Sequence, residues 1–461
     1  MKKRALLVAL SLIFVFSLLA GCNTPADNSN AGNTPATSDK PTTSNSPAAG
    51  NSATPSLDPT ASSIIDPETP EYERDLSLSG TLKVWYDRDD FIAEITSRFN
   101  AIYPNIKLEF ERVAHTEARG KMQLDGPAGT GADVFMIPHD HLGNAVLDGL
   151  VEPIDPTLQK KLEGSQVASA VKTVTLNGEM YGVPIVIENI ALLYNKDLWG
   201  PNPPATMEEI IAFAKTYNDY STGKWTMAWQ VNDAYHNYHW LSVNGFEIFG
   251  PNHDDYRNSG FGSAEAIKGN EYIKYLRENL LDVPEADSNW DGSVARFQNG
   301  DLPLTISGPW AVADAKKNGV NFGVTSLPTV NGKQPVCFSG VRLACMSSFT
   351  EVPELATAFL DFLSSIEGAT YFYQVEGLIP ALKDATLVPG LANDEILMGF
   401  SKQTPYTVPM PIIPEVQAMW EGLRETFIYV WEKQLTPEEG AAKGMETYKV
   451  GLQSMGIAID F

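Results

Sequence analysis

The chain has 461 residues, a formal net charge of −24 and a charged fraction of 20%. Its length is enough for one large hydrophobic core or two ordinary ones, and the apolar fraction of 43% is that of a globular protein. Because so acidic a surface repels phosphate, the composition argues against nucleic acid and anionic ligands as partners.

The N-terminus has the form of a secretory signal. A basic start, "MKKR", precedes an apolar run over residues 5–20 that is short for a transmembrane helix. The motif "LLAGC" then resembles the bacterial lipobox. This resemblance implies a lipoprotein signal peptide over 1–21 and a lipid on Cys22, which anchors the chain to the outer face of the cytoplasmic membrane. An ordinary signal peptide with a chance cysteine is the alternative.

Residues 22–77 predict a flexible linker. Asn, Ser, Thr, Pro and Ala dominate this segment, and no aromatic residue occurs between Cys22 and Tyr72. Such a composition cannot bury enough apolar surface to offset the entropy of the chain. A globular body on this linker would stay near the membrane and still move.

The first part of the globular body alternates between two periodicities. Residues 80–86, 105–113 and 132–137 have the composition of strands, and residues 89–104 form a helical pattern between the first two. One face of that helix carries Phe91, Ile95, Phe99 and Ile102. The alternation predicts βαβ units and a mainly parallel sheet.

The same alternation returns later in the chain. Helices are predicted over 206–219 and 263–280, a strand over 302–308, and an almost wholly helical segment over 414–455. These patterns predict an α/β protein of two lobes followed by C-terminal helices.

Two cysteines remain in the body, and both lie in the β-rich run "PVCFSGVRLAC". Cys337 and Cys345 are eight residues apart, which on a continuous strand is about 26 Å, too far for a disulfide. We interpret both as small buried apolar residues.

Two histidine pairs could carry chemistry. His139 and His141 in "HDH", with His236 and His239 in "YHNYH", supply enough nitrogens for a zinc site, although solvated polar residues are the simpler interpretation. Asp140 precedes an apolar helical pattern, so it could cap that helix or bind a ligand. The residues alone leave these alternatives open.

Aromatic side chains favour a carbohydrate site. Trp290, Trp310 and Trp420 lie in predicted loops or near helix starts. A sugar has an apolar C–H face and a rim of hydroxyls, so its site combines flat rings with carboxylates. Core packing is the alternative for each single tryptophan.

Three segments carry a resemblance to a known family: "VPIVIENIALLYNKDLWGPNPPATMEEI", "TISGPWAVADAKKNGVNFGVTSLPTVNGK" and "MPIIPEVQAMWEGLRET". They resemble the maltose/maltodextrin-binding proteins, which are extracellular solute-binding proteins of carbohydrate ABC importers. The similarity runs from about Gly80 to the C-terminus. It implies a monomeric binding protein with no enzymatic activity, cofactor or metal.

The resemblance also implies a periplasmic-binding-protein-like α/β fold with a ligand cleft and a hinge between two lobes. The N-terminal lobe would comprise residues 78–187 and 340–390, and the C-terminal lobe residues 188–339 and 391–461. The implied partners are a maltodextrin and the membrane permease subunits of an importer. A β-linked glucan as ligand and a secreted glycoside hydrolase are the alternatives.

The family's ligand-binding positions correspond to ten residues here. They are Asp89, Glu117, Asp140, Glu188, Asp233, Tyr235, Trp290, Trp310, Trp420 and Arg424. Asp90, Ile137 and His141 depart from the family's basic residue, tryptophan and arginine, so the particular sugar stays open.

Overall fold

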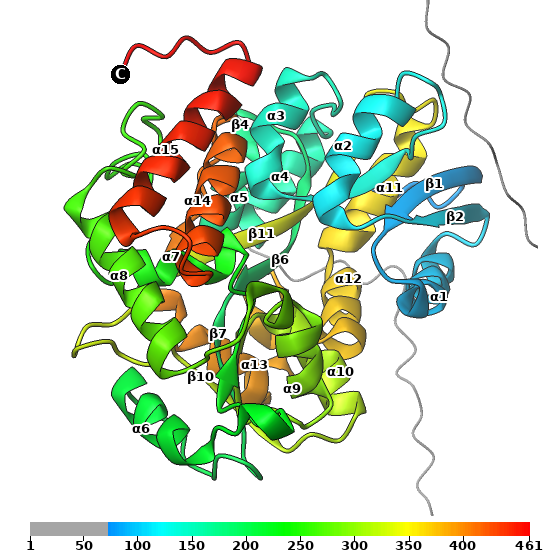
Figure 1. Ribbon diagram of the computed structural model, residues 1–461. Helices are drawn as coiled ribbons and strands as arrows, with labels where there is room; N and C mark the ends of the chain where they lie inside the picture. Colours follow the sequence, from blue (N-terminus) through cyan, green and yellow to red (C-terminus); the bar gives the residue numbers. More distant parts are fainter. Residues whose placement is uncertain (1–71) are drawn as a thin grey trace, which may run out of the picture. The chain divides into compact units, whose positions relative to one another are not determined.

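The computed structural model describes residues 72–461, so the predicted signal peptide, the Cys22 lipidation site and nearly all of the predicted linker lie outside the described residues. Two main sheets with their own helices make up the described part (Figure 1), and a two-stranded sheet of β4 (Thr175–Leu176) and β5 (Glu179–Met180) accompanies them. The chain is an α/β protein of two lobes, as its sequence predicts.

The first sheet has seven strands in the order β12-β6-β11-β3-β1-β2, with β13 paired to β11. The strands are β1 (Gly80–Tyr86), β2 (Ile106–Arg112), β3 (Val134–Pro138), β6 (Val183–Asn189), β11 (Cys337–Met346), β12 (Ile379–Pro380) and β13 (Thr407–Pro409). Strands β1, β2 and β3 are parallel, whereas β11 runs antiparallel to both β3 and β6.

The sheet is therefore mixed, and the mainly parallel sheet predicted from the sequence is wrong. The helix–strand alternation correctly predicts the parallel strands that a local crossover connects. It says nothing of β6 and β11, which come from distant parts of the chain and complete the sheet through long-range pairing.

Helices cover this first sheet (Figure 1). They are α1 (Ile92–Ile102), α2 (His115–Asp125), α3 (Leu142–Leu147), α4 (Pro156–Ser165), α5 (Ala168–Thr173), α11 (Pro353–Ser364) and α12 (Ile366–Tyr371). The buried face of α1 consists of Ile95, Phe99 and Ile102, with the spacing that the sequence predicts.

The second sheet has four strands in the order β10-β7-β9-β8. They are β7 (Ala191–Asn195), β8 (Met227–Ala228), β9 (Leu304–Ser307) and β10 (Phe322–Thr325). The remaining helices are α6 (Met207–Tyr217), α7 (Ala234–Ser242), α8 (Ala264–Asn279), α9 (Arg296–Gln298), α10 (Val312–Lys317), α13 (Glu395–Ser401), α14 (Val416–Trp431) and α15 (Pro437–Ser454), of which α14 and α15 pack side by side.

Local signals explain where several of these helices begin. Thr206 and Glu209 form a capping box at the start of α6, and Thr436 and Glu439 form another at α15. Ser263 accepts a hydrogen bond from the backbone N–H of Ala266 and begins α8. None of the helices within residues 72–461 is both long and apolar enough to cross a bilayer.

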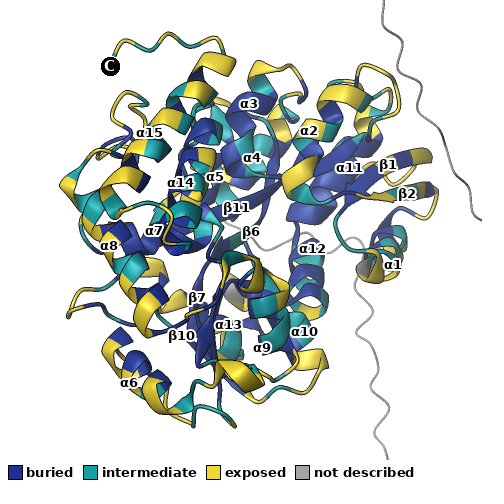
Figure 2. Ribbon diagram, in the orientation of Figure 1, coloured by how far each residue is buried: buried dark blue, intermediate teal, exposed yellow. Residues whose placement is uncertain are grey.

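Each main sheet has a hydrophobic core of its own, and Figure 2 shows the central strands buried beneath more exposed helices. Buried residues belong to the first core up to Val186 and to the second from Ile190. The chain returns to the first core between Phe338 and Val341. From Leu382 onward, every residue of either core belongs to the second one. Strands β6 and β11 thus lie where the chain passes between the lobes.

The two cysteines lie on one strand, as predicted. Cys337 and Cys345 are the first and ninth residues of β11, and both are buried free thiols. Burial raises the pKa of Cys337 to about 12, so this thiol stays protonated and unreactive.

Candidate ligand-binding cleft

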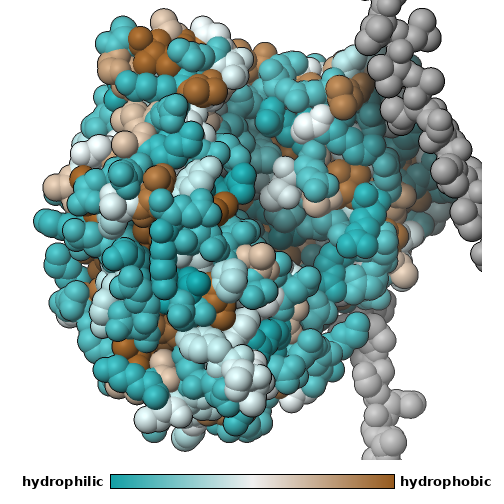
Figure 3. All heavy atoms as spheres, in the orientation of Figure 1, coloured by the Kyte–Doolittle hydropathy of each residue, from teal (hydrophilic) through white to brown (hydrophobic). Residues whose placement is uncertain are grey.

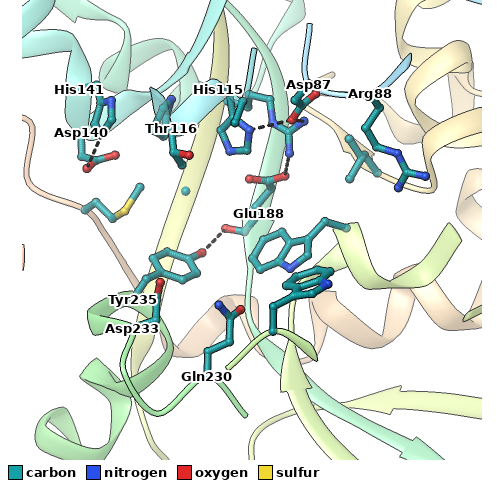
Figure 4. Close-up of a pocket in the computed structure, with 18 of the residues that line it drawn as sticks. Asp87, Arg88, His115, Thr116, Asp140, His141, Glu188, Gln230, Asp233 and Tyr235 are labelled. Carbon is teal, nitrogen blue, oxygen red and sulfur yellow. Dashed lines mark hydrogen bonds and ion pairs between the residues drawn. The ribbon is translucent and has the colours of Figure 1, made fainter. Parts of the chain in front are cut away.

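A cavity of about 1040 Å³ is lined by residues of both lobes, just above the roughly 300–1,000 Å³ range of ligand pockets. Figure 3 shows that most of the surface around it is hydrophilic. Nine of the ten predicted ligand-binding residues line this cavity: Asp89, Asp140, Glu188, Asp233, Tyr235, Trp290, Trp310, Trp420 and Arg424. In Figure 4, Asp140 and His115 lie on one side of the cavity and Tyr235 and Gln230 on the other, with Glu188 between them.

The tenth predicted residue, Glu117, does not line the cavity. It is exposed in the first turn of α2, whereas His115 and Thr116, which precede it, both line the cleft. Because successive helical residues point about 100° apart, an offset of one or two positions in the family correspondence moves the side chain off the cleft face.

The strand ends of the N-terminal lobe explain why acidic residues gather here. Strands β1 and β3 are parallel neighbours, so their carboxyl ends meet at one edge of the sheet. Asp87 follows β1, and the one-turn helix η2 (His139–His141) follows β3. The edge therefore brings residues about fifty positions apart in sequence to one side of the cavity.

A buried ion network forms at this edge. The Arg342 guanidinium, which is 5% exposed, donates to Glu188 Oε1 at 2.8 Å and to Asp87 Oδ2 at 3.3 Å. His115 Nδ1 lies 2.8 Å from the same Asp87 oxygen. Burial opposes the charge on Asp87, but Arg342 and His115 hold the pKa of that carboxyl well below its usual range. Glu188 is thereby fixed as an oriented carboxylate on the crossing strand β6.

The "HDH" motif divides its roles between structure and cleft. The His139 ring is fully buried and accepts from the backbone N–H of Val341 at 3.0 Å through Nδ1, while Nε2 lies 3.1 Å from the carbonyl oxygen of Met410. Burial lowers the pKa of His139, so the neutral ring bridges three chain segments. His141 lines the cavity, and burial likewise lowers its pKa.

Asp140 connects the two lobes. Its Oδ2 accepts a hydrogen bond from Trp420 Nε1 at 2.8 Å and another from Gln417 Nε2 at 3.3 Å, both on α14. Neither η2 nor α3 has a side-chain capping bond. The interpretation of Asp140 as a helix cap is therefore wrong, and its carboxylate faces the cavity instead.

Aromatic rings dominate the C-terminal side of the cavity. Trp310 follows β9 in the one-turn helix η6 (Pro309–Ala311) and packs against both cores. Trp420 lies in α14, and Trp290 is 39% exposed. All three indoles line the cavity, which leaves part of each ring available to a ligand.

Tyr235 on α7 completes this group of rings. Its ring centroid lies 6.3 Å from that of Trp310, and its hydroxyl donates weakly to the backbone carbonyls of Phe338 and Glu188 at 3.4 and 3.5 Å. Burial raises the pKa of Tyr235 well above its usual value, so the hydroxyl stays protonated.

The remaining predicted residues occupy capping and rim positions. Asp233 caps α7, since its Oδ1 accepts from the backbone N–H of His236 at 2.9 Å. Arg424 and Asp89 lie at the rim, with side chains 46% and 64% exposed. Arg424 pairs with Glu421 of its own helix at 2.9 Å.

The histidine pairs do not form a zinc site in the described residues. Across residues 72–461, no three His, Cys, Asp or Glu side chains come together in a way that could hold a metal ion. His239 packs against Trp240, with ring centroids 3.9 Å apart.

Sequence reasoning missed many lining residues, and most of the missed ones are polar or charged, with Arg342 the most buried of the arginines. Arg342 had a usable signal, because it is the single charge in the apolar strand "GVRLAC", and a buried charge requires partners. Nothing local marks Gln230, which lies between β8 and α7.

Comparison with known proteins identifies the family. The model of the bacterial extracellular solute-binding protein family matches residues 94–399. A maltotriose-binding protein of Pyrococcus abyssi is 28% identical over 75% of this chain and 76% of its own length. A galactooligosaccharide-binding protein of Bacillus subtilis is 28% identical over 81% of this chain and 90% of its own.

Two further matches are a solute-binding protein of an ABC transporter and a crystal structure with a bound ligand. A maltooligosaccharide ABC transporter solute-binding lipoprotein of Streptococcus pneumoniae is 30% identical over 65% of this chain and 72% of its own. The crystal structure of a cyclo/maltodextrin-binding protein complexed with maltotetraose is 31% identical, covers 82% of this chain and 98% of its own, and has a TM-score of 0.67. The chain belongs to the family of bacterial extracellular solute-binding proteins, which bind solutes and are not enzymes.

Proposed function

We propose that the protein captures neutral oligosaccharides, maltodextrins foremost, and delivers them to the membrane permease subunits of an ABC importer. The observation that carries this proposal is the composition of the cleft. Trp290, Trp310 and Trp420 line the same cavity as the oriented carboxylates of Asp140 and Glu188. Indole rings stack on the C–H faces of pyranoses, and carboxylates accept hydrogen bonds from the hydroxyl rim.

The charge of the lining supports a neutral ligand. Nine acidic side chains and four arginines line the cavity, and two of the nine acidic side chains share the single positive charge of Arg342. A phosphorylated or carboxylated sugar would meet net repulsion there. Uncharged hydroxyls instead accept from the arginines and donate to the carboxylates.

The position of the cleft between lobes supports a capture-and-release role. Strands β6 and β11 link the lobes and contribute Glu188 and Arg342 to the floor of the cavity. A ligand that contacts both walls would favour the closed arrangement of the lobes, as hinge-closing binding proteins require.

Calorimetry with maltose, maltotriose, maltotetraose and cellotriose tests the ligand. We expect maltotriose and maltotetraose to bind at least several-fold more tightly than maltose, because all three tryptophans of the described lining belong to the C-terminal lobe and longer chains reach more subsites. Cellotriose should bind weakly, since a flat β-1,4 chain cannot follow an arc of rings. Tight cellotriose binding without maltotriose binding would exclude the maltodextrin assignment.

A second candidate is a galactooligosaccharide or another β-linked oligosaccharide. The relative that favours it is the Bacillus subtilis galactooligosaccharide-binding protein, which is similar over 81% of this chain. Adding galactotriose to the same titrations decides between the two, since the preferred ligand should bind at least tenfold more tightly than the other.

Anchoring through Cys22 is part of the proposal. The "LLAGC" motif supports it, as does the similarity to a streptococcal solute-binding lipoprotein. We expect Cys22→Ala either to be released from the membrane or to remain unprocessed. A variant that fractionates with the membrane at the parent's mature size would contradict lipidation.

A further inference from the structure

Glu376 is a buried acid of the cleft that the family correspondence does not include. It is the last residue of the short helical turn η7 (Phe372–Glu376), lines the cavity and is 5% exposed. Gly377 ends the turn with φ of +70°, and a Cβ there would lie 3.5 Å from the backbone nitrogen of Ala313. Glu376 therefore lies close to the beginning of α10, beside the turn that carries Trp310.

Glu376 differs from every other acidic residue of the lining in having no partner. The other eight all have one: Asp87 and Glu188 contact Arg342, Asp90 and Asp314 contact Arg88, Asp89 lies 3.8 Å from Arg112, Asp140 accepts from Trp420, Asp233 accepts from His236, and Glu421 contacts Arg424. Neither oxygen of Glu376 has a hydrogen bond or ion pair within residues 72–461, and Oε1 is fully buried.

The protonation of Glu376 follows from this environment. Burying an ionised carboxylate that has no cation and no donor is strongly unfavourable. Burial accordingly raises the pKa of Glu376 well above the usual range of a glutamate. This environment favours the protonated carboxylic acid, which has one O–H donor and remaining acceptor capacity.

Such an acid is unfavourable for folding unless it binds something. An apolar side chain of the same volume would avoid the unsatisfied polar atoms and stabilise the protein. A sugar hydroxyl both donates and accepts hydrogen bonds, which is the complement of a neutral carboxylic acid. The indole of Trp310, which lines the same cavity, would hold a pyranose ring with its hydroxyl rim toward the neighbouring side chains.

We propose that Glu376 is a further ligand-binding residue of the cleft, whose carboxyl group exchanges hydrogen bonds with a hydroxyl of the bound oligosaccharide beside Trp310. This inference rests on the proposed function, since it concerns how the same cleft holds its sugar. It distinguishes Glu376 from the ionised carboxylates, which can only accept.

Two substitutions separate ligand binding from folding. Glu376→Met removes the polar atoms at similar volume, and Glu376→Gln keeps a neutral donor and acceptor. We expect Glu376→Met to raise the Kd for maltotriose about 3- to 10-fold, as the loss of one hydrogen bond does, and to unfold without ligand at the parent's temperature or above. Glu376→Gln should bind within about 3-fold of the parent, by the same hydrogen-bond reasoning.

Controls make each outcome decisive. Glu278→Met, on an exposed position of α8 outside the lining, should change neither affinity nor unfolding temperature, and Glu376→Ala replaces the methionine variant if that variant does not fold. Parent affinity in Glu376→Met would overturn the inference, as would equal losses of affinity and stability in Glu376→Met and Glu376→Gln. A parent that binds none of the oligosaccharides would instead refute the proposed function.

Discussion

The two walls of the cleft are built from different chemistry and from different parts of the fold. The N-terminal wall comes mainly from the carboxyl ends of β1 and β3, and most of its polar side chains are already bonded, as Asp87 and His115 are to one another. The C-terminal wall comes mainly from helix starts and carries the rings of Tyr235 and Trp310. One wall is rigidly polar, and the other offers flat apolar surface.

This difference indicates a division of labour. A carboxylate binds a hydroxyl well only if it is held ionised and in place, and the ion network of Arg342 does this. An indole ring needs no charge partner and binds any pyranose of suitable shape. The polar wall should therefore set orientation and stability, and the aromatic wall should set much of the affinity.

We expect the largest effect on stability from substituting Arg342, which is the only buried arginine among the described lining residues. Arg342→Met leaves Asp87 and Glu188 buried without a counter-charge, which costs about 3–5 kcal/mol of stability. Denaturant unfolding measures this change. Arg98→Met is the control, because Arg98 forms a partly exposed pair with Glu94 and should change stability by about 0.5 kcal/mol or less. Equal stability of the two variants would refute the network.

Removing a ring should mainly affect affinity. Trp310→Ala is expected to weaken maltotriose binding by about 1–3 kcal/mol, by analogy with the stacking of bases on aromatic side chains, or on the order of 10- to 100-fold in Kd. Trp199→Ala removes a half-buried indole outside the lining and serves as the control. Unchanged titrations with folded Trp310→Ala would show that the aromatic wall does not contact the ligand.

The walls also differ in how far the sequence predicts them. Strand β1 has the predicted bounds, and α6 begins one residue after the predicted start, because both depend on local patterns. The gathering of polar residues at two strand ends follows from parallel pairing. The ligand-binding positions came through the family resemblance, and one of them, Glu117, lies outside the cavity because a small offset turns a helical side chain away.

Long-range contacts account for what the sequence could not predict. Asp140 and Trp420 are 280 positions apart, and only the assembled lobes show that they are bonded. The antiparallel place of β11 between β3 and β6 has the same origin. The unpartnered state of Glu376 is likewise a property of everything around it, and a single glutamate in a sequence carries no sign of it.

Each lobe buries one histidine completely, which gives a third comparison. His139 has hydrogen bonds at both ring nitrogens, whereas neither nitrogen of His239 has a partner in residues 72–461. Burial lowers the pKa of both rings below 6.5, and that of His239 well below it. The folded state therefore binds fewer protons than the unfolded state below about pH 6.5, so stability falls as pH decreases from that value toward the folded pKa.

His239→Phe tests this linkage. The variant keeps an aromatic ring beside Trp240 but cannot titrate, so as the pH decreases below about 6 it should lose up to about 1.4 kcal/mol less stability per pH unit than the parent. Denaturant unfolding at a series of pH values measures the slopes, with His253→Asn, at a half-buried position where asparagine tolerates the left-handed backbone, as control. Parallel curves for parent and His239→Phe would contradict the assignment.

The smallest effect is expected where the walls meet in a partly exposed ion pair. Arg88 of the N-terminal lobe donates to Asp314 on α10 at 3.2 Å, and the two side chains are 31% and 32% exposed. Such pairs contribute about 0.2–1 kcal/mol and weaken with salt. Asp314→Asn should therefore lower maltotriose affinity by less than about fivefold, and the difference from the parent should shrink as salt is added, because salt already screens the pair. Asp287→Asn, outside the lining, is the control. A larger loss that persists at high salt would mean that Asp314 contacts the ligand itself, and the polar wall would then extend across the cleft onto α10.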